Sequence, residues 1–101
     1  MSGANEIIHQ SMRLRIMAAL TVLAPGAALE FTRLKALVEA TDGNLGAHLD
    51  TLAGAGYVAL DKRFVGRRPP TRVKATAAGR RAFAEHVAYL REIIDRTADA
   101  P

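Results

Sequence analysis

Residues 41–58 read TDGNLGAHLDTLAGAGYV. Thr41 or Asp42 can cap the start of a helix, and Gly56 suits the left-handed residue that often follows a helix end. The apolar residues between them recur at the spacing of one helix face. They are Leu45, Leu49, Leu52 and Ala55. We therefore predict a helix over residues 42–55 whose buried face carries the leucines.

A shorter helix and a brief strand are predicted just before this helix. Thr32 can cap a helix over residues 32–38, whose apolar residues share one face. Residues 29–31 are too few for a helix and predict a short strand. Two helices joined by about three residues have the spacing of a helix-turn-helix.

A two-stranded hairpin, called a wing, is predicted over residues 57–75. Its first strand runs from Tyr57 to Phe64 and its second from Thr71 to Ala75. The Gly and Pro residues between them predict a turn. Because an isolated hairpin is only marginally stable, the wing must pack against the helices.

Longer helices are predicted at both ends of the chain. The first covers about residues 6–24 and stops at Pro25-Gly26, and the last covers residues 76–96 with Thr76 as its cap. The element order is helix, short strand, helix, helix, two-stranded wing and C-terminal helix. This order predicts a single α+β, mainly α, domain over residues 1–101 with a winged helix-turn-helix fold.

The composition excludes several classes of protein. The chain has no cysteine, so disulfides and thiolate metal sites are impossible. No apolar run reaches the roughly 18 residues of a membrane span, and no secretory signal is visible, so we expect a cytoplasmic protein. His9, His48 and His86 are scattered, and no nucleophile is paired with a base. We therefore expect no metal, no cofactor and no enzyme activity.

Positive charge is concentrated in one segment of the chain. The net charge is +4, but residues 62–84 alone carry eight Lys or Arg and no acidic residue. Such a block repels itself unless a polyanion compensates it, although a solvated basic face is the alternative. Five basic side chains of the wing are predicted to contact DNA. They are Arg63, Arg67, Arg68, Arg72 and Lys74.

The helix over residues 42–55 is predicted to enter the major groove of DNA, as the second helix of a helix-turn-helix does. Asn44 can pair with adenine, Ala47 can touch a thymine methyl group, and His48 can reach a base edge or a phosphate. Thr41 and Thr51 complete the predicted set. A capping role for Asn44 and an unpartnered surface position for His48 are the alternatives.

Three residues of this helix do not fit a simple DNA-reading surface. Gly43 and Gly46 each cost about 1 kcal/mol relative to alanine in a helix. Tight packing on the preceding helix is the favoured explanation, ahead of close approach of the backbone to phosphate. Asp50 would repel phosphate and is the strongest argument against tight DNA binding.

The last helix is long for such a small body. Its apolar residues near the C-terminus exceed what one small core needs, which predicts a homodimer. The alternative is that they cover the core of the monomer. The predicted interface residues are Leu14, Tyr89, Leu90, Ile93 and Ile94.

The chain resembles the small winged-helix transcriptional regulators related to the MarR and ArsR groups. The resemblance covers about residues 8–90 and rests on several stretches in a fixed order. They are HQSMRLRIM (9–17), FTRL (31–34), TDGNLGAHL (41–49), LAGAGYV (52–58), FVGRRP (64–69) and TAAGRRAF (76–83).

The resemblance implies a dimeric DNA-binding regulator, with the helix from Asp42 in the major groove and Arg67-Arg68 in the wing. Related proteins often have Ser where Gly46 stands and a basic residue where Ala47 or Asp50 stands. Here the wing should therefore matter more for binding phosphate. Metal sensing does not carry over because the cysteines are absent, whereas an unknown small-molecule effector stays an open alternative.

The leading hypothesis is a sequence-specific regulator of transcription that binds double-stranded DNA as a homodimer. The alternative is a winged-helix module for protein–protein interaction without specific DNA binding. Asp50, Ala47 and the two glycines slightly favour that alternative.

Overall fold

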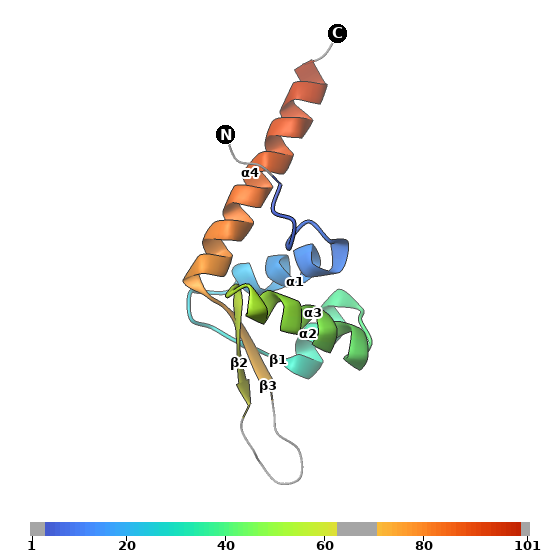
Figure 1. Cartoon of the computed structure of the whole chain (residues 1–101), viewed down its shortest axis with the longest axis vertical. Coiled ribbons are helices and arrows are strands. Elements are labelled where there is room, and N and C mark those ends of the chain that lie inside the picture. The colour runs from blue at the N-terminus through green and yellow to red at the C-terminus, as the bar shows by residue number, and fades with distance from the viewer. Residues whose placement is uncertain (1–3, 63–70, 100–101) are drawn as a thin grey trace.

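The computed structural model describes residues 4–62 and 71–99, and in them it shows four helices and a three-stranded sheet (Figure 1). The predicted winged helix-turn-helix fold of the α+β, mainly α, class is confirmed. The elements are α1 (Ser11–Thr21), β1 (Leu29–Glu30), α2 (Phe31–Val38), α3 (Asp42–Gly54), β2 (Val58–Lys62), β3 (Thr71–Ala75) and α4 (Ala77–Asp99).

The sheet is antiparallel, with strand order β1-β3-β2. Val58 pairs with Ala75 at one end of the hairpin, and Leu29 of β1 pairs with Val73 on the other side of β3. Val58, Val73 and Ala75 are buried, so this face of the sheet covers the helices. The third strand and this packing stabilise a hairpin that would be marginal alone.

The core is built from the apolar faces that the sequence predicts. Leu45, Leu49 and Leu52 of α3 are at most 1% exposed. They pack with buried side chains from every other helix and from the sheet. The other core residues are Ile8, Ile16, Met17, Leu20, Leu34, Val38, Val58, Val73, Ala75 and Ala82.

The first helix is shorter than the predicted range of residues 6–24. Residues 6–9 form a separate turn, and α1 begins only at Ser11. The side-chain oxygen of Asn5 accepts hydrogen bonds from two backbone N–H groups of this turn. Asn5 thus caps this turn, whereas the extended residue Gln10 separates the turn from α1 and caps α1 by accepting the Arg13 N–H.

Other helix ends differ from the predictions by a few residues. Glu30, in an extended conformation, occupies the position before α2, so Thr32 lies inside the helix and does not cap it. Thr41 does cap α3, because its hydroxyl accepts the backbone N–H of Asn44 at 3.2 Å. The last helix continues past residue 96 to Asp99.

The start of α4 is fastened to the chain between α3 and β2. The Thr76 hydroxyl accepts the Gly79 N–H at 2.9 Å and donates to the Gly56 carbonyl at 2.6 Å. Gly56 has a φ of +82°, as expected for a residue just beyond a helix end. Gly79 lies so close to Tyr57 that a Cβ there would overlap the Tyr57 carbonyl oxygen.

Arg80 of α4 closes the C-terminal end of α1. Its guanidinium donates to the carbonyls of Thr21 (3.2 Å), Leu23 (3.0 Å) and Ala24 (3.1 Å). Carbonyls at a helix end have no partner inside the helix, so these bonds satisfy groups that would otherwise need water. Arg80 therefore serves the fold, although it belongs to the basic block of residues 62–84.

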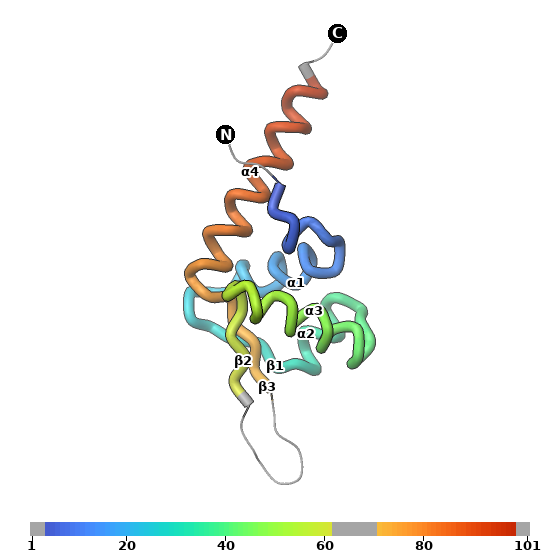
Figure 2. The backbone as a smooth tube through the Cα atoms, viewed as in Figure 1, coloured from blue at the N-terminus to red at the C-terminus, as the bar shows by residue number. Residues whose placement is uncertain are grey.

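The C-terminal half of α4 extends beyond the body of the protein, with the N-terminal segment beside it (Figure 2). Strands β2 and β3 point toward the opposite end of the molecule. Across residues 4–62 and 71–99, no helix combines the length and the apolar character that crossing a membrane requires.

Candidate nucleic-acid interface

Helix α3 presents an exposed face on the side away from its buried leucines. Asn44, Ala47 and Thr51 are exposed on it, as predicted. The Thr51 hydroxyl donates to the Ala47 carbonyl at 3.2 Å, which leaves the oxygen available as an acceptor. Within the described chain, no hydrogen bond involves the amide side chain of Asn44. The helix therefore offers an amide and a hydroxyl on one accessible surface.

His48 lies at the margin of this exposed face, between the exposed residues and the buried leucines. Its ring is half-buried, and Nδ1 is 3.2 Å from Nη1 of Arg13 in α1. The same guanidinium donates through Nε to the Ile7 carbonyl at 2.5 Å. His48 is therefore not the unpartnered surface histidine considered as an alternative, because Arg13 holds it.

The two acidic residues of α3 have different surroundings. Asp42 lies in the first turn and pairs with Lys35 of α2 at 2.7 Å. This pair offsets the negative charge at the end of the helix that would face phosphates. Asp50 is exposed on the outer side of α3, and within residues 4–62 and 71–99 it has no ion pair. The negative charge of Asp50 therefore still repels a polyanion such as DNA.

Tight packing of Gly43 and Gly46 against the preceding helix is contradicted. Apart from the neighbouring residues and the backbone of α3 itself, a Cβ built on either residue meets no atom of the described chain within 4 Å. The glycines therefore leave a low, smooth surface on α3 next to Ala47. Such a surface allows another molecule to approach the helix backbone.

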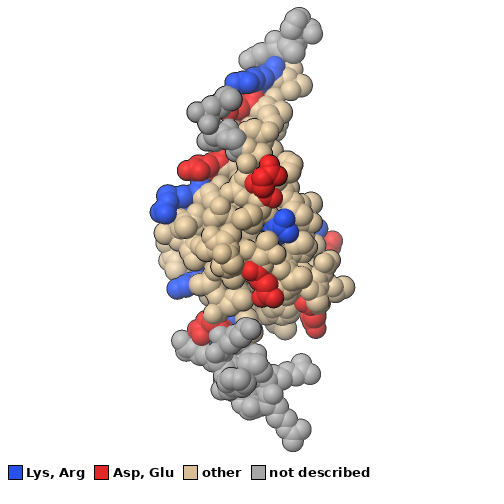
Figure 3. Space-filling view, viewed as in Figure 1, with Lys and Arg blue, Asp and Glu red and all other residues tan. Residues whose placement is uncertain are grey.

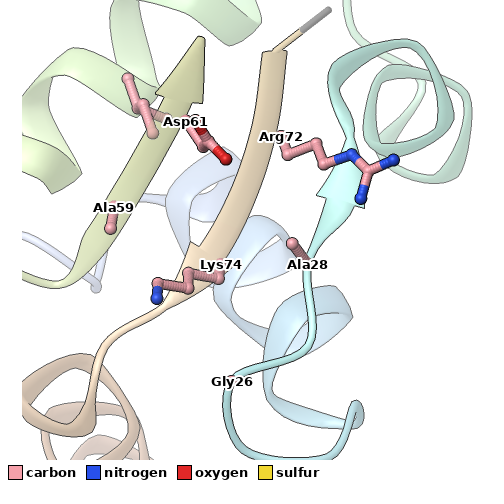
Figure 4. Close-up of a pocket in the computed structure, with 7 residues that line it drawn as sticks. Gly26, Ala28, Ala59, Asp61, Arg72 and Lys74 are labelled. Atoms are coloured by element: carbon pink, nitrogen blue, oxygen red, sulfur yellow. The ribbon is translucent and has the colours of Figure 1, made fainter. Parts of the chain in front are cut away.

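The outer face of the sheet carries two of the five predicted wing contacts, Arg72 and Lys74. Both are exposed and line a hollow of about 360 Å³ together with Asp61 and Gly26 (Figure 4). Arg72 points across β1, whereas Lys74 points the other way. The other predicted wing contacts, Arg63, Arg67 and Arg68, lie outside the described residues.

The described charges do not form a continuous basic patch on the face drawn in Figure 3, where Lys and Arg side chains alternate with acidic ones. Within the basic block, Arg80 is engaged with carbonyls at the end of α1. A count of basic residues along the sequence thus overstates the charge available to a partner.

Four of the five predicted dimer residues lie in α4. Tyr89 and Leu90 are half-buried, whereas Ile93 is 45% exposed and Ile94 is 64% exposed. Leu14 is half-buried and already packs against the core, so it has less surface to offer.

His86 is buried in α4 one turn before this exposed section. It is 1% exposed, and its Nδ1 accepts the backbone N–H of Asn5 at 3.1 Å. Burial lowers the pKa of His86 from 6.5, and the nearby His9 lowers it further. In the part of the chain that is described, no three His, Asp or Glu side chains converge as metal ligands.

Sequence reasoning missed the roles of Arg13 and Arg80. The available signal for Arg13 was a charged residue directly between two apolar ones, Met12 and Leu14. For Arg80 the signal was indirect: the helix that ends before Pro25-Gly26 leaves carbonyls that need a donor.

The fold and the exposed helix define a winged-helix protein whose α3 is available to a nucleic acid. The family model described as winged helix DNA-binding domain matches residues 12–94. The chain therefore belongs to the family of winged helix DNA-binding domains.

Individual relatives agree with this assignment. An uncharacterised protein of Methanocaldococcus jannaschii is 35% identical over 82 residues, which are 81% of this chain and 86% of that protein. The structure of a transcriptional regulator homologue from Pyrococcus horikoshii OT3 is similar with a TM-score of 0.81 and 27% identity, over 95% of this chain and 91% of that one.

A MarR-family transcriptional regulator from Silicibacter pomeroyi has the same fold, with a TM-score of 0.69 and 22% identity. The similarity covers 93% of this chain and 60% of that chain. The resemblance to small winged-helix proteins is thus confirmed in the fold and in the family, which is that of winged helix DNA-binding domains.

Proposed function

We propose that this chain regulates transcription by binding specific sites in double-stranded DNA as a homodimer. Helix α3 would lie in the major groove, with Asn44, Ala47 and Thr51 toward the bases. The exposure of these three side chains, above a fully buried leucine stripe, is the observation that carries the proposal. A regulator of this kind acts on cellular DNA in the cytoplasm, and a small-molecule effector is compatible with it.

The wing would supply affinity and α3 would supply specificity, because phosphate contacts carry no sequence information. Arg72 and Lys74 are exposed beside the hairpin and can reach the DNA backbone. Arg63, Arg67 and Arg68 follow from the sequence as further phosphate contacts. Asp50 limits what α3 itself adds to affinity.

The homodimer is supported by the apolar face of α4. Ala82 and His86 lie on this face and are buried against the body. Two helical turns further along the same face, Ile93 and Ile94 have no cover within the described chain. A second copy placed around a twofold axis would bury these residues and also present two α3 helices to a palindromic site.

The test is binding of the purified protein to its own upstream DNA and to random duplex, each at two salt concentrations. We expect tighter binding to the upstream fragment and a strong salt dependence. Replacing Arg67 and Arg68 with alanine should lower the salt slope by about 1–2 units on both DNAs. Asn44→Ala should reduce discrimination between the DNAs more than it reduces overall affinity.

Two outcomes would contradict the proposal. Equal, weak binding to both fragments would leave only a basic surface. The complete absence of salt-dependent binding, with a soluble protein recovered as partner, would favour the protein-interaction module instead.

A further inference from the structure

We propose that Arg13, which lies outside the reading helix, is a positioning residue for base recognition. Its guanidinium fixes the His48 ring so that Nε2–H faces the DNA as a hydrogen-bond donor to a purine acceptor in the major groove. This inference rests on the proposed function, because it requires α3 to lie in that groove.

The direction of the hydrogen bond follows from the chemistry of the two side chains. Arginine has five N–H donors and no acceptor. The 3.2 Å contact between Nη1 of Arg13 and Nδ1 of His48 therefore requires Nδ1 to accept. A neutral imidazole that accepts at Nδ1 carries its proton on Nε2. Arg13 thus selects one tautomer of His48.

Arg13 is also held by hydrogen bonds to residues other than His48. Its Nε donates to the Ile7 carbonyl at 2.5 Å, and its backbone N–H donates to the side chain of Gln10. The turn that contains Ile7 is fixed by Asn5, whose backbone N–H is bonded to His86 of α4. A guanidinium already held by the Ile7 carbonyl loses little entropy when it orients His48, which is how preorganisation improves recognition.

The other ring nitrogen of His48, Nε2, has no hydrogen-bond partner among the described residues and is not fully buried. Among the described residues, Nε2 of His86 is buried without a partner, but Nε2 of His48 is not enclosed in this way. His48 lies one helical turn after Asn44 and one turn before Thr51, so the three side chains share one flank of α3. The flank then presents a neutral N–H donor beside an amide and a hydroxyl.

An oriented N–H donor matches the acceptors of purines in the major groove, which are N7 of adenine and N7 and O6 of guanine. A phosphate oxygen is the other acceptor in DNA that could receive this bond. The half-buried position of His48, on the same flank as Asn44, favours a base edge.

The tautomer can be measured on the free protein by long-range ¹H–¹⁵N correlation spectroscopy of the histidine rings. We expect His48 to be protonated at Nε2 in the wild type and to become a mixture of tautomers in Arg13→Met. A wild-type ring protonated at Nδ1 would overturn the inference, whatever the protein binds. Thermal melting of Arg13→Met confirms that the variant is folded at the temperature used.

The DNA contact can be measured by selecting sites from a randomised duplex library. We expect Arg13→Met and His48→Asn to lose preference at the same base position, by roughly fivefold or more. His48→Gln places an amide N–H near the position of Nε2, so it should keep the preference. In the His48→Gln background, Arg13→Met should then have no further effect on that position.

Different failures lead to different conclusions. If Arg13→Met weakens binding equally to all sequences, His48 contacts phosphate and base reading is overturned. If His48 is protonated at Nε2 but the protein selects no sequence from the library, the proposed sequence-specific DNA binding is overturned. The proposed base contact of His48 is then overturned as well.

Discussion

The backbone N–H of Asn5 donates a hydrogen bond to Nδ1 of His86, 3.1 Å away. Asn5 also donates from its side chain to the Tyr57 hydroxyl at 3.0 Å. One residue therefore ties the N-terminal turn both to α4 and to the segment that follows α3. The bond to His86 exists only while Nδ1 is unprotonated, which makes this connection sensitive to pH.

The folded protein should lose stability as the pH falls through 6.5. Burial, and second the neighbouring His9, lower the pKa of His86 below its ordinary value of 6.5, and Tyr89 is the other titratable ring beside it. The unfolded chain then binds more protons than the folded one between the folded-state pKa and 6.5. The stabilising contribution of neutral His86 is complete above 6.5 and is lost as the pH falls through the folded-state pKa.

Urea unfolding of the wild type and of His86→Asn, from pH 8 down to pH 5, measures this effect. The Asn side chain can still accept the Asn5 N–H but does not titrate, so the pH dependence should be smaller in the variant. His9→Gln is the control and should keep most of the dependence, because burial is the larger cause. Identical pH profiles for the wild type and His86→Asn would contradict the prediction.

The parts of the fold set by local pattern could be predicted from the sequence, whereas contacts between distant residues could not. The leucine spacing of α3 and the Thr41 cap depend on neighbours within one or two turns, and the sequence predicted the spacing and narrowed the cap to Thr41 or Asp42. The bond between Asn5 and His86 joins residues 81 positions apart, and no periodicity carries that information.

The site was predictable to the same extent. Exposure of Asn44, Ala47 and Thr51 follows from the helical period once the leucines are inside. The contact between His48 and Arg13 does not follow from the period, because it depends on how α1 crosses α3. The packing of Gly43 and Gly46 was predicted wrongly, since a sequence does not reveal how far apart two helices lie.

Arg80→Lys should destabilise the protein by about 1–3 kcal/mol, because one ammonium group cannot replace the guanidinium bonds to three carbonyls. Chemical unfolding measures the loss. Arg81→Lys is a matched control on an exposed neighbouring residue and should change the stability by less than about 0.5 kcal/mol. Equal stability of the two variants would show that the carbonyls of the α1 end are satisfied equally well by water.

Gly79→Ala should also be destabilising, although alanine is the better helix former. The new Cβ would overlap the Tyr57 carbonyl oxygen, and that atom belongs to the backbone and cannot rotate away. Overpacking of this kind costs about 1–3 kcal/mol or more, which outweighs the gain of about 1 kcal/mol in helix propensity.

The control for this substitution is Gly54→Ala in α3, where a Cβ meets nothing within 4 Å. It should raise the melting temperature slightly, whereas Gly79→Ala should lower it by several degrees. If both substitutions raise the melting temperature, α4 can shift away from Tyr57 at little cost.

The homodimer makes a prediction that does not depend on DNA. Ile94 is 64% exposed on the apolar face of α4, so Ile94→Asp should leave the folded chain almost unaffected. In a twofold interface the substitution appears twice and places two carboxylates in an apolar contact. We therefore expect association to weaken by roughly a hundredfold, as two losses of about 1.4 kcal/mol would give. Leu37→Asp, an exposed apolar residue on α2, is the matched control.

Sedimentation equilibrium over a range of concentrations measures the assembly. The wild type and Leu37→Asp should approach twice the chain mass of 10.8 kDa, whereas Ile94→Asp should remain near that mass. The melting temperatures of the wild type and of Leu37→Asp should rise with concentration, as they do when folding and association are linked, whereas that of Ile94→Asp should not. A monomeric wild type, or a dimer that Ile94→Asp leaves intact, would place the second copy away from this end of α4.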